Sequence, residues 1–428
     1  MYRALAIGAA VWLAVSGAAG AAPLQEELQT LLQTHPDVRA AERRLDQSSA
    51  AVNEARAPYL PQLRISGEYG YENVDSPVAR AAGQPAVEQS REVGRFTMTQ
   101  KVFDGFRTDG QLKGAIAREF KSGYALERAQ QQILFRGTNA YLDVLKQTEL
   151  VDIALETEMT IRRQLALEDE RVRRGSGLSV DVLQSKSRLQ AAKETRVRLE
   201  GRLREAIAEY YAVYNHAPEI GSMSAPLPPD DLLPESLQNA VDIALAESPL
   251  IKQSEETIGE AKQQRKVAVS DYFPQVNMVA EGAMENDAEG IPGNRKELFV
   301  GVRAEWELFD GFATAAASER TAKRVAETME IHASLSLEVA KRVEVAWENL
   351  ITLRERAELA SNAAAIAGEL FAARQRLRTA GRESVVNVLD AEAELNGARS
   401  RATAARYDAL VQVYRVLFEV GRLDIATY

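Results

Sequence analysis

The residue types that most often carry covalent or metal chemistry are scarce in this sequence. The chain of 428 residues has no cysteine, which excludes disulfides, thiolate nucleophiles and cysteine metal ligands. Its three histidines, His35, His216 and His332, are scattered and do not indicate a metal cluster. Gly175-Ser176-Gly177 follows no predicted strand, which argues against a nucleotide-binding fingerprint, and no nucleophile elbow or phosphate-binding glycine loop is present. We therefore expect no enzyme activity and no catalytic, cofactor or metal site.

Charged side chains on helices are the remaining candidates for function. Charged residues make up 27% of the chain and aromatic residues only 6%, which is typical of long helices rather than of an all-β protein. The net charge is −10 and no basic cluster is present, so we expect no nucleic-acid partner. Carboxylates on exposed helices usually serve solvation. Any special role must therefore come from where the helices place them.

The first 21 residues have the features of a cleaved signal peptide. Arg3 supplies positive charge, residues 4–15 form a short apolar run, and Ala19-Gly20-Ala21 fits a signal-peptidase site. The apolar run is shorter than the ~20 residues that cross a bilayer as a helix, although a signal anchor or a buried core helix is the alternative. We expect an exported chain that starts near Ala22. Because every later stretch of 18 residues contains charge, a membrane-embedded form would be a β-barrel.

The chain contains an internal duplication with two constant offsets. Near the start the offset is 213: Tyr59-Leu60-Pro61-Gln62 recurs as Tyr272-Phe273-Pro274-Gln275. Further on it is 206: Phe103-Asp104-Gly105-Phe106 recurs as Phe309-Asp310-Gly311-Phe312. The change of seven residues between the two offsets indicates an exposed loop, where insertions accumulate. We divide the chain into a first repeat (22–215), a linker (216–236) and a second repeat (237–428).

The absence of proline over long stretches predicts very long helices. Residues 86–217 and 293–428 contain none, and Gly105 to Gly175 and Gly311 to Gly381 are each 70 positions apart. A helix of that length is about 100 Å long at about 1.5 Å per residue. Gly175 and Gly381 are the expected turns between paired helices. Apolar residues at alternating steps of three and four predict a coiled-coil seam in the second repeat, formed by Val343, Ala346, Leu350, Leu353, Ala357, Ala360, Ala364, Ala367 and Phe371 on one helix and Val388, Ala391, Leu395, Ala398, Ala402, Ala405 and Ala409 on the other.

Each repeat also contains two segments with a period of two, between a short helix (about 37–57 and 249–271) and the long one. We predict strands at about 62–72, 94–103, 275–284 and 297–308, with hairpin loops at about 73–92 and 285–296. Each is close to the ~9–11 residues with which a tilted strand crosses an outer membrane. Phenylalanine, Trp306, Tyr59 and Tyr272 gather beside them, as in an interfacial aromatic girdle. Two soluble hairpins packed on helices are the alternative.

Four strands are too few to close a barrel, because bacterial barrels have eight or more. A four-stranded sheet in a bilayer would leave two edges unpaired, which hydrocarbon does not tolerate. Helices about 100 Å long also lack a core to pack on within one chain. We therefore expect a ring of copies. Neither argument sets their number.

The ordered, duplicated motifs resemble those of the TolC family of outer-membrane channels over nearly the whole mature chain, from Leu24 to about Leu423. The resemblance rests on an early proline, two strand starts, two Phe-Asp-Gly corners and two turn motifs: Pro36, Leu60-Pro61-Gln62, Phe273-Pro274-Gln275, Phe103-Asp104-Gly105, Phe309-Asp310-Gly311, Arg174-Gly175…Val180-Asp181-Val182-Leu183 and Gly381-Arg382…Val388-Leu389-Asp390-Ala391.

The resemblance implies a mainly α-helical chain with a membrane β-barrel portion. Three copies would share a 12-stranded barrel and a 12-helix tunnel in the periplasm of a Gram-negative bacterium. Residues 215–248 and the termini would form an equatorial belt. The implied partners are a periplasmic adaptor, an inner-membrane pump of the ABC type or another type, and outer-membrane lipid. The second half, Gly381-Arg382…Leu389-Asp390-Ala391-Glu392-Ala393-Glu394-Leu395, looks closest to members of type I protein secretion systems.

The resemblance also implies a gate at the two helical turns, where rings of like charge select ions. Family members narrow this mouth with two carboxylates, at positions that are Asn387 and Asp390 here, so strong cation binding is in doubt. Asp181 matches a residue that links neighbouring helices, and its aromatic partner is replaced by Arg378, with which it would form an ion pair. Glu383 stands where the family often has arginine. These charges are equally consistent with helix capping and solvation. Adaptor docking is implied for the turn residues Arg174, Gly175, Ser179, Gly381 and Ser384.

Three functions remain open from the sequence. The first is an exit duct for type I protein secretion, and the second is an outer-membrane channel for efflux of drugs or solvents. The third is a periplasmic coiled-coil adaptor or scaffold. An adaptor normally has one helical hairpin between β-rich domains, whereas this chain has two predicted hairpins and two strand pairs, which disfavours the third.

Overall fold

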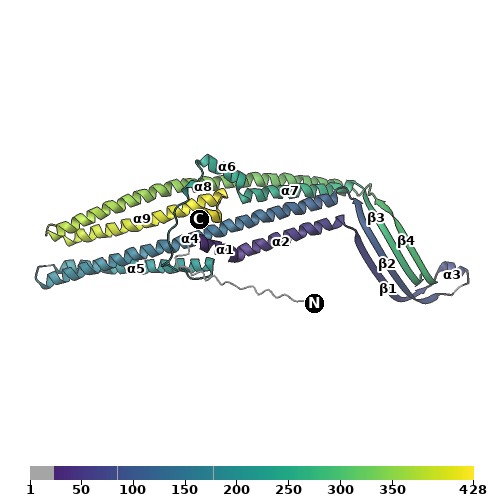
Figure 1. Ribbon diagram of the computed structural model, residues 1–428, viewed down its shortest axis with the longest axis horizontal. Helices are drawn as coiled ribbons and strands as arrows, with labels where there is room; N and C mark the ends of the chain where they lie inside the picture. The colour runs from purple at the N-terminus through teal and green to yellow at the C-terminus, as the bar shows by residue number, and fades with distance from the viewer. Residues whose placement is uncertain (1–23, 84, 177) are drawn as a thin grey trace, which may run out of the picture. The chain divides into compact units, whose positions relative to one another are not determined.

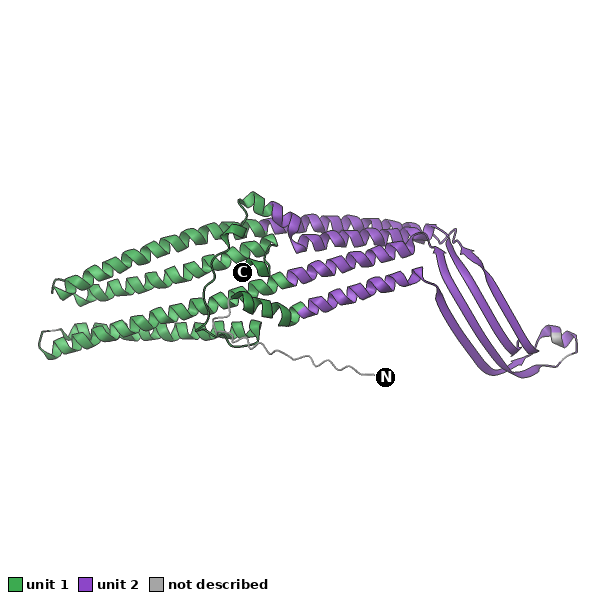
Figure 2. Cartoon of the chain, in the orientation of Figure 1, with its two compact units in different colours: residues 1–38, 130–241, 342–428 green, residues 39–129, 242–341 purple. Residues whose placement is uncertain are grey.

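The computed structural model describes residues 24–428 apart from Gln84 and Gly177, and the predicted signal peptide at 1–21 lies outside this range. The chain divides into two compact units (Figure 2). Unit 1 comprises the described part of residues 1–38 together with 130–241 and 342–428; unit 2 comprises 39–129 and 242–341. Long helices and one four-stranded sheet make up the described chain, which confirms the mainly α-helical fold with four strands.

Unit 1 contains two helical hairpins. The first joins the end of α4 (Arg107–Arg173) to α5 (Ser179–Tyr214), and the second joins the end of α8 (Ala313–Thr379) to α9 (Val385–Val420). All the predicted seam positions of the second hairpin are buried or half-buried, and Ala367, Leu395 and Ala398 form a core cluster with Ala364 and Phe371 against it. The predicted coiled-coil seam is therefore confirmed. The first hairpin has matching clusters, such as Ile161, Leu189 and Ala192.

Buried tyrosines of unit 1 hold the linker and the first helix against the long helices. Tyr141 of α4 donates a hydrogen bond to the Ser224 carbonyl (3.3 Å) and accepts one from the Ser224 amide (3.1 Å). Tyr210 bonds Glu27 of α1 (Leu24–Thr34). Burial raises the pKa of both Tyr141 and Tyr210 above the ordinary tyrosine range. Residues 216–236 contain turns and one short 3-10 helix, η2 (Asp230–Leu232), and lead to α6 (Leu237–Glu247).

Unit 2 contains an antiparallel sheet in the order β1-β2-β3-β4 (Figure 1). The strands are β1 (Gln62–Val74), β2 (Val87–Phe103), β3 (Gln275–Ala288) and β4 (Ile291–Glu305). The helices α2 (Pro36–Arg56) and α7 (Pro249–Val269) lead into β1 and β3 through the 3-10 turns η1 (Ala57–Tyr59) and η3 (Ser270–Tyr272). The described chain ends with η4 (Ile425–Thr427) in unit 1.

The strands differ in length from the sequence prediction. β2 begins at Val87, inside the expected loop 73–92, and β3 and β4 extend through most of the expected loop 285–296. Polar pairs across the ladder extend it: Tyr71 donates to Glu88 (2.7 Å), and Gln89 donates to Glu72 (3.3 Å). Between β1 and β2 lies α3 (Pro77–Ala81), at the end of the sheet away from α2 and α7 (Figure 1). β4 ends at Glu305 rather than near residue 308, because the chain turns into the Phe309–Phe312 corner.

The register of the two hairpins shows the duplication directly. Gln62 lies opposite Thr99 in β1–β2, and Gln275 lies opposite Glu305 in β3–β4. The offset of 213 carries Gln62 to Gln275, and the offset of 206 carries Thr99 to Glu305. The seven-residue difference therefore lies between β1 and β2, where the first hairpin has the longer connection. The predicted position of the variable loop is confirmed.

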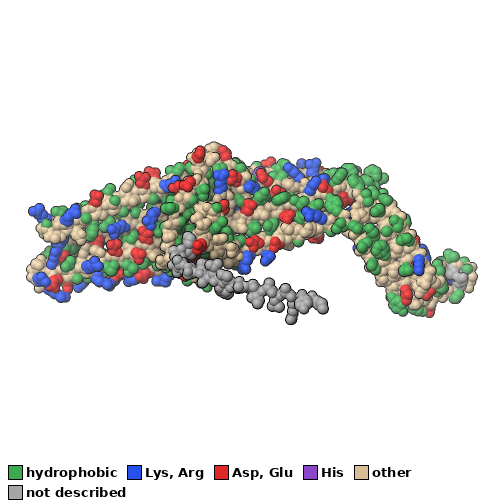
Figure 3. All heavy atoms as spheres, in the orientation of Figure 1, with side chains coloured by type: hydrophobic (Ala, Val, Ile, Leu, Met, Phe, Trp, Pro, Cys, Tyr) green, Lys and Arg blue, Asp and Glu red, His purple; other side chains and the backbone are tan. Residues whose placement is uncertain are grey.

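Large apolar side chains lie exposed on the sheet. Ile65, Tyr69, Leu298 and Val300 are each between 68% and 83% exposed, and Figure 3 shows hydrophobic side chains gathered over the strands. Contiguous exposed apolar surfaces mark sites of contact with a membrane or with another protein. No helix in residues 24–428, the gaps noted above aside, is both long enough and apolar enough to cross a membrane.

The two Phe-Asp-Gly motifs form the corners between strand and long helix. In each, glycine and the following phenylalanine have positive φ: Gly105 (65°), Phe106 (68°), Gly311 (69°) and Phe312 (70°). The aspartate then caps the helix, since Asp104 accepts from the Thr108 amide (2.9 Å) and Asp310 from the Thr314 amide (2.7 Å). The repeated motif therefore builds the same corner twice.

Candidate functional site

The two helical turns of unit 1 hold the candidate gate residues. Gly175 and Gly381 have φ of 77° and 71°, the left-handed conformation that ends a helix and favours glycine. The amides of Ser176 and Arg382 return to carbonyls five residues earlier, on Arg171 and Leu377. Both turns are exposed, and Lys and Arg side chains gather at these ends of the hairpins (Figure 3). The predicted turn role of both glycines is confirmed.

Three of the predicted site residues cap the start of α9. The Ser384 hydroxyl accepts from the Asn387 amide (3.2 Å), and the Glu383 carboxylate accepts from the Asn387 side-chain amide (2.6 Å) and from the Ser384 amide (3.0 Å). These hydrogen bonds, that of Asn387 first, hold the pKa of Glu383 below its ordinary value. Within one chain, Ser384, Glu383 and Asn387 therefore form a local helix cap, which was one of the two readings of these charges.

We expect Ser384→Ala to destabilise the protein by about 1 kcal/mol, because it removes the acceptor for an otherwise unpaired amide at a helix start. Ser179→Ala at the start of α5 is the matched control, since the N-cap there is Leu178 and no side chain caps the helix. Chemical denaturation of the two variants measures the difference. Equal effects would show that the Ser384 hydrogen bond contributes nothing.

Arg378 links the two hairpins. Its guanidinium donates to the Glu168 carboxylate of α4 (3.0 Å) and to the Glu383 carbonyl (3.1 Å). Glu168 is 5% exposed and also bonds Arg171 of its own helix (2.9 Å). Asp181 is half-buried in the first turn of α5 and makes no ion pair among the described residues. Arg378 thus pairs with Glu168 within the chain, and the suggested Asp181–Arg378 pair is not formed there.

Asp390 makes the second link near the turns. Its carboxylate accepts from Arg188 of α5 (2.5 Å), and both side chains are about half exposed. Further from the turns, α4 and α9 are joined by more pairs of the same kind: Glu156–Arg399 (3.3 Å), Glu149–Arg406 (2.6 Å) and Lys146–Asp408 (3.6 Å). Ion pairs therefore run along the contact between the two hairpins of one chain. Sequence patterns missed them, because the partners are separated by 200 residues or more along the chain.

One buried acid near the turns was also missed. Glu392 of α9 is 3% exposed, and neither of its carboxylate oxygens has a hydrogen-bond partner within the described chain. Burial raises its pKa to about 7, and the nearby Gln164 opposes the shift too weakly to offset it. Glu392 follows the seam residue Ala391 directly, so the buried face of α9 is wider than the predicted seam.

The residues predicted to dock an adaptor are accessible. Arg174, Gly175, Ser179, Gly381 and Ser384 are all exposed. The Arg174 side chain is 75% exposed and bonds Glu170 in the last turn of α4 (2.9 Å), as Arg173 bonds Asp169 (2.8 Å). The first turn therefore presents exposed arginine side chains whose ion pairs are made with carboxylates of the adjoining helix end.

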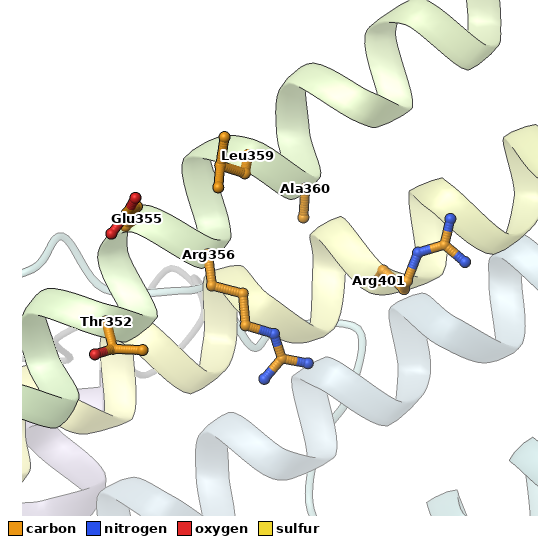
Figure 4. Close-up of a pocket in the computed structure, with 6 residues that line it drawn as sticks. All are labelled: Thr352, Glu355, Arg356, Leu359, Ala360 and Arg401. Carbon is orange, nitrogen blue, oxygen red and sulfur yellow. The ribbon is translucent and has the colours of Figure 1, made fainter.

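One hollow of the described chain lies between the helices of the second hairpin. A groove of about 430 Å³ between α8 and α9 is lined by Thr352, Glu355, Arg356, Leu359, Ala360 and Arg401. Figure 4 shows that the guanidinium groups of Arg356 and Arg401 point in different directions and do not converge on it. No group of three or more metal-ligating side chains occurs among the described residues.

Comparison with known proteins gives one family. The model of the family described as "Outer membrane efflux protein" matches residues 28–216 and 240–420. The alkaline protease secretion protein AprF of Pseudomonas aeruginosa is 24% identical over 92% of this chain and 83% of its own length. The outer membrane efflux protein BepC of Brucella suis is 23% identical over 89% and 80%.

Solved structures share the fold. The outer-membrane channel OprN superimposes with a TM-score of 0.79 over 94% of this chain and 90% of its own, at 18% identity. CusC, described as forming a transmembrane channel, gives a TM-score of 0.80 over 98% of both chains, at 15% identity. Both repeats and the sheet are therefore matched by known channel structures.

Proposed function

This chain belongs to the outer membrane efflux protein family, and on that premise we propose that three copies form a passive duct through which substrates leave the cell. The protein is an outer-membrane channel of a Gram-negative bacterium, with its helices in the periplasm. The proposed trimer shares a barrel of twelve strands and a tunnel of twelve helices. The observation that carries the proposal is the exposed apolar sheet, whose strands β2 and β4 are each followed along the chain by a helix of 67 residues. An inner-membrane pump and a periplasmic adaptor would supply energy and substrate.

For the substrate we propose proteins exported by type I secretion. Support comes from the second turn motif, from Gly381 to Leu395, and from the similarity to a protein named for alkaline protease secretion. Other relatives are named for efflux and for pyoverdine export, so small molecules are the second candidate. Deleting the gene tests this choice. Loss of one or a few large proteins from the culture medium supports secretion, whereas higher sensitivity to drugs or solvents with an unchanged medium contradicts it.

We further propose that the links between hairpins hold the mouth of the duct narrow. Arg378–Glu168 and Arg188–Asp390 lie beside the turns and join different hairpins. Asp181, with no ion pair within the described chain, is proposed to face a neighbouring copy. Because Asp390 is bonded to Arg188 and Asn387 to Glu383, we propose that the mouth binds cations only weakly.

Replacing Arg188 and Arg378 with glutamine should raise single-channel conductance several-fold in a planar bilayer, because both links beside the turns are lost. The control is Arg173→Gln with Arg174→Gln, which removes the same charge at the same end of the helices but breaks only bonds within the first hairpin. Asp181→Asn, made alone in the wild-type protein, tests by the same conductance measurement whether Asp181 contributes to the gate. If conductance rises equally in the control, or rises in neither variant, the Arg188–Asp390 and Arg378–Glu168 ion pairs do not restrict the mouth.

The exposed turn residues are the proposed docking site for the adaptor. A photocrosslinking amino acid at Arg174 or Ser179 should capture the adaptor in whole cells, and one at Glu348, on the exposed surface of α8 far from the turns, serves as the control. Capture at Glu348 alone would place the docking site elsewhere.

A further inference from the structure

The sheet has a second face, opposite the exposed apolar one, which carries charged side chains in ion pairs. Successive residues of a strand point to opposite faces, so this polar face contains the residues that alternate with the exposed apolar ones. Its charges pair across neighbouring strands: Arg91–Glu68 (3.4 Å), Arg95–Glu285 (3.5 Å) and Arg303–Glu281 (3.1 Å). In a membrane barrel the apolar face contacts lipid and the polar face lines the interior. The polar face is therefore the surface that a substrate inside the barrel would meet.

One aromatic side chain of β4 lies on the polar face. Phe299 is opposite Glu281 of β3 in the register, so the two side chains point to the same side of the sheet. Phe299 is 45% exposed. Along β1, β3 and β4, which the structure describes in full, no other aromatic residue lies on this face, because Tyr69 and Tyr71 belong to the apolar face. An exposed ring is thus set among polar and charged neighbours.

The ring of Phe299 extends over Gly301, the next residue on the same face. A β-carbon placed on Gly301 would lie 2.7 Å from Cζ of the ring and 3.3 Å from both Cε atoms, so any other residue at this position would displace the ring. Val279, opposite Gly301 in the register, is 2% exposed although its cross-strand neighbour has no side chain. The glycine therefore leaves room for the ring to lean along the strand, and close to half of Phe299 still remains exposed.

The charged neighbours of Phe299 on β4 have partners within the sheet. Glu297 accepts a hydrogen bond from Arg295 (3.1 Å), and Arg303 pairs with Glu281. Two ion pairs thus flank the ring along β4, and the ring is the apolar contact between them.

The first repeat has no such ring. The offset of 206 carries Phe299 to Val93 and Gly301 to Arg95. Val93 is 4% exposed, and Arg95 beside it on the same face bonds Glu285. The duplicated fold therefore does not require an exposed ring at this position, and the reason for Phe299 is specific to the second repeat.

We infer that Phe299 is a contact for exported polypeptide inside the barrel, where its ring stacks against aromatic side chains and packs against aliphatic side chains of the unfolded cargo. This inference rests on the proposed function and names the groups of the substrate that the duct binds. Each of the three proposed copies contributes one such ring at the same level. An unfolded polypeptide presents apolar side chains one after another and can touch the rings of more than one copy, whereas a small molecule on an open wall would touch one.

Blocks of the current through single channels measure this contact. An unstructured peptide that contains several tyrosines is added on the barrel side of a planar bilayer, and a peptide of the same length and charge with serine in place of tyrosine is the comparison. The tyrosine peptide should block the wild-type channel for longer than the serine peptide. In Phe299→Ala its residence time should fall roughly fivefold, because an aromatic pair is lost. Phe299→Tyr keeps the ring and should retain the long blocks.

The matched control is Tyr69→Ala, which removes a ring from the apolar face of the same sheet and should leave the residence time unchanged. Phe299→Gln, which removes the ring but keeps a long side chain over Gly301, should shorten the blocks as Phe299→Ala does. The conductance of the open channel and the trimer band on an unheated gel show whether each variant has assembled.

Equal residence of the two peptides in the wild-type channel, or an equal loss in Phe299→Ala and Tyr69→Ala, overturns the inference and leaves the duct standing. Blocks by a small aromatic compound such as indole, with none by either peptide, assign the ring to small-molecule substrates and overturn it as well. If neither Phe299→Ala nor Phe299→Gln forms a trimeric channel, the ring serves the fold and the inference is wrong. A wild-type protein that conducts no ions overturns the proposed function and the inference together.

Discussion

Gly105→Ala should destabilise the protein by about 3 kcal/mol or more and reduce the amount that reaches the outer membrane. The backbone at Gly105 has φ of 65°, which costs an alanine about 1 kcal/mol. The added β-carbon would also lie 2.5 Å from the Ser270 carbonyl oxygen and 3.0 Å from Cβ of Phe273. Ser270 is buried and its carbonyl belongs to the main chain, so the clash moves backbone rather than the end of a flexible side chain.

The control for Gly105→Ala separates the clash from the backbone conformation. Gly83 has φ of 74°, and nothing lies within 4 Å of a β-carbon placed on it. Gly83→Ala therefore carries the conformational cost alone. Thermal unfolding of the detergent-solubilised protein and the amount in outer-membrane fractions measure both variants. If Gly105→Ala behaves like Gly83→Ala, the corner is not packed against η3 as the structure describes.

The fold was predictable because the sequence motifs of its corners, turns and long helices each occur twice, once in each repeat. Two Phe-Asp-Gly corners, two turn glycines and two proline-free stretches at constant offsets distinguish the long helices and the strands from chance patterns. The coiled-coil seam followed from the spacing of small apolar residues, which depends only on the helical period. These features are local, so one sequence is sufficient to recognise them.

The ends of the strands were less predictable. The polar alternation beyond Glu72 resembles a loop in the sequence, but Tyr71, Gln89 and their cross-strand partners continue the ladder. A strand whose stability comes from polar pairs across the sheet carries no apolar period to reveal it. The same polar composition made the loops look longer than they are.

The contacts at the candidate gate were not predictable from one sequence. Arg378 and Glu168 are 210 positions apart, and their pairing depends on how α4 and α8 are rotated about their own axes. Charged residues at successive turns of both helices offer many possible partners of similar chemistry. The resemblance placed Arg378, Asp390 and Asn387 near the turns, but which side chain each one bonds came only from the packed hairpins.

Glu392→Gln should stabilise the protein at pH 8 and leave its stability nearly unchanged at pH 4.5. Burial raises the pKa of Glu392 to about 7, whereas the ordinary value for the unfolded chain is 4.5. The folded state therefore binds a proton that the unfolded state has lost between these two pH values. Stability is fully present below about 4.5, falls as the pH rises to about 7, and then stays level. The difference between these two pKa values corresponds to a change of up to about 3 kcal/mol in the free energy of unfolding, and burial of Glu392 means that little of it is screened by solvent.

Glutamine has the shape of the protonated acid and cannot ionise, so the variant should lose this dependence on pH. Glu158 does not confuse the measurement: the hydrogen bond from Arg196 lowers its pKa, so the stabilisation by Glu158 is lost only as the pH falls below about 4.5. The proteins compared are the wild type, Glu392→Gln and the control Glu394→Gln, since Glu394 is 63% exposed and its pair with Arg401 contributes little. Denaturation curves of the three proteins from pH 4.5 to 8 measure the difference. A constant offset between wild type and Glu392→Gln over this range would mean that the Glu392 carboxylate keeps one protonation state, and that water or a neighbouring copy solvates it in the assembled protein.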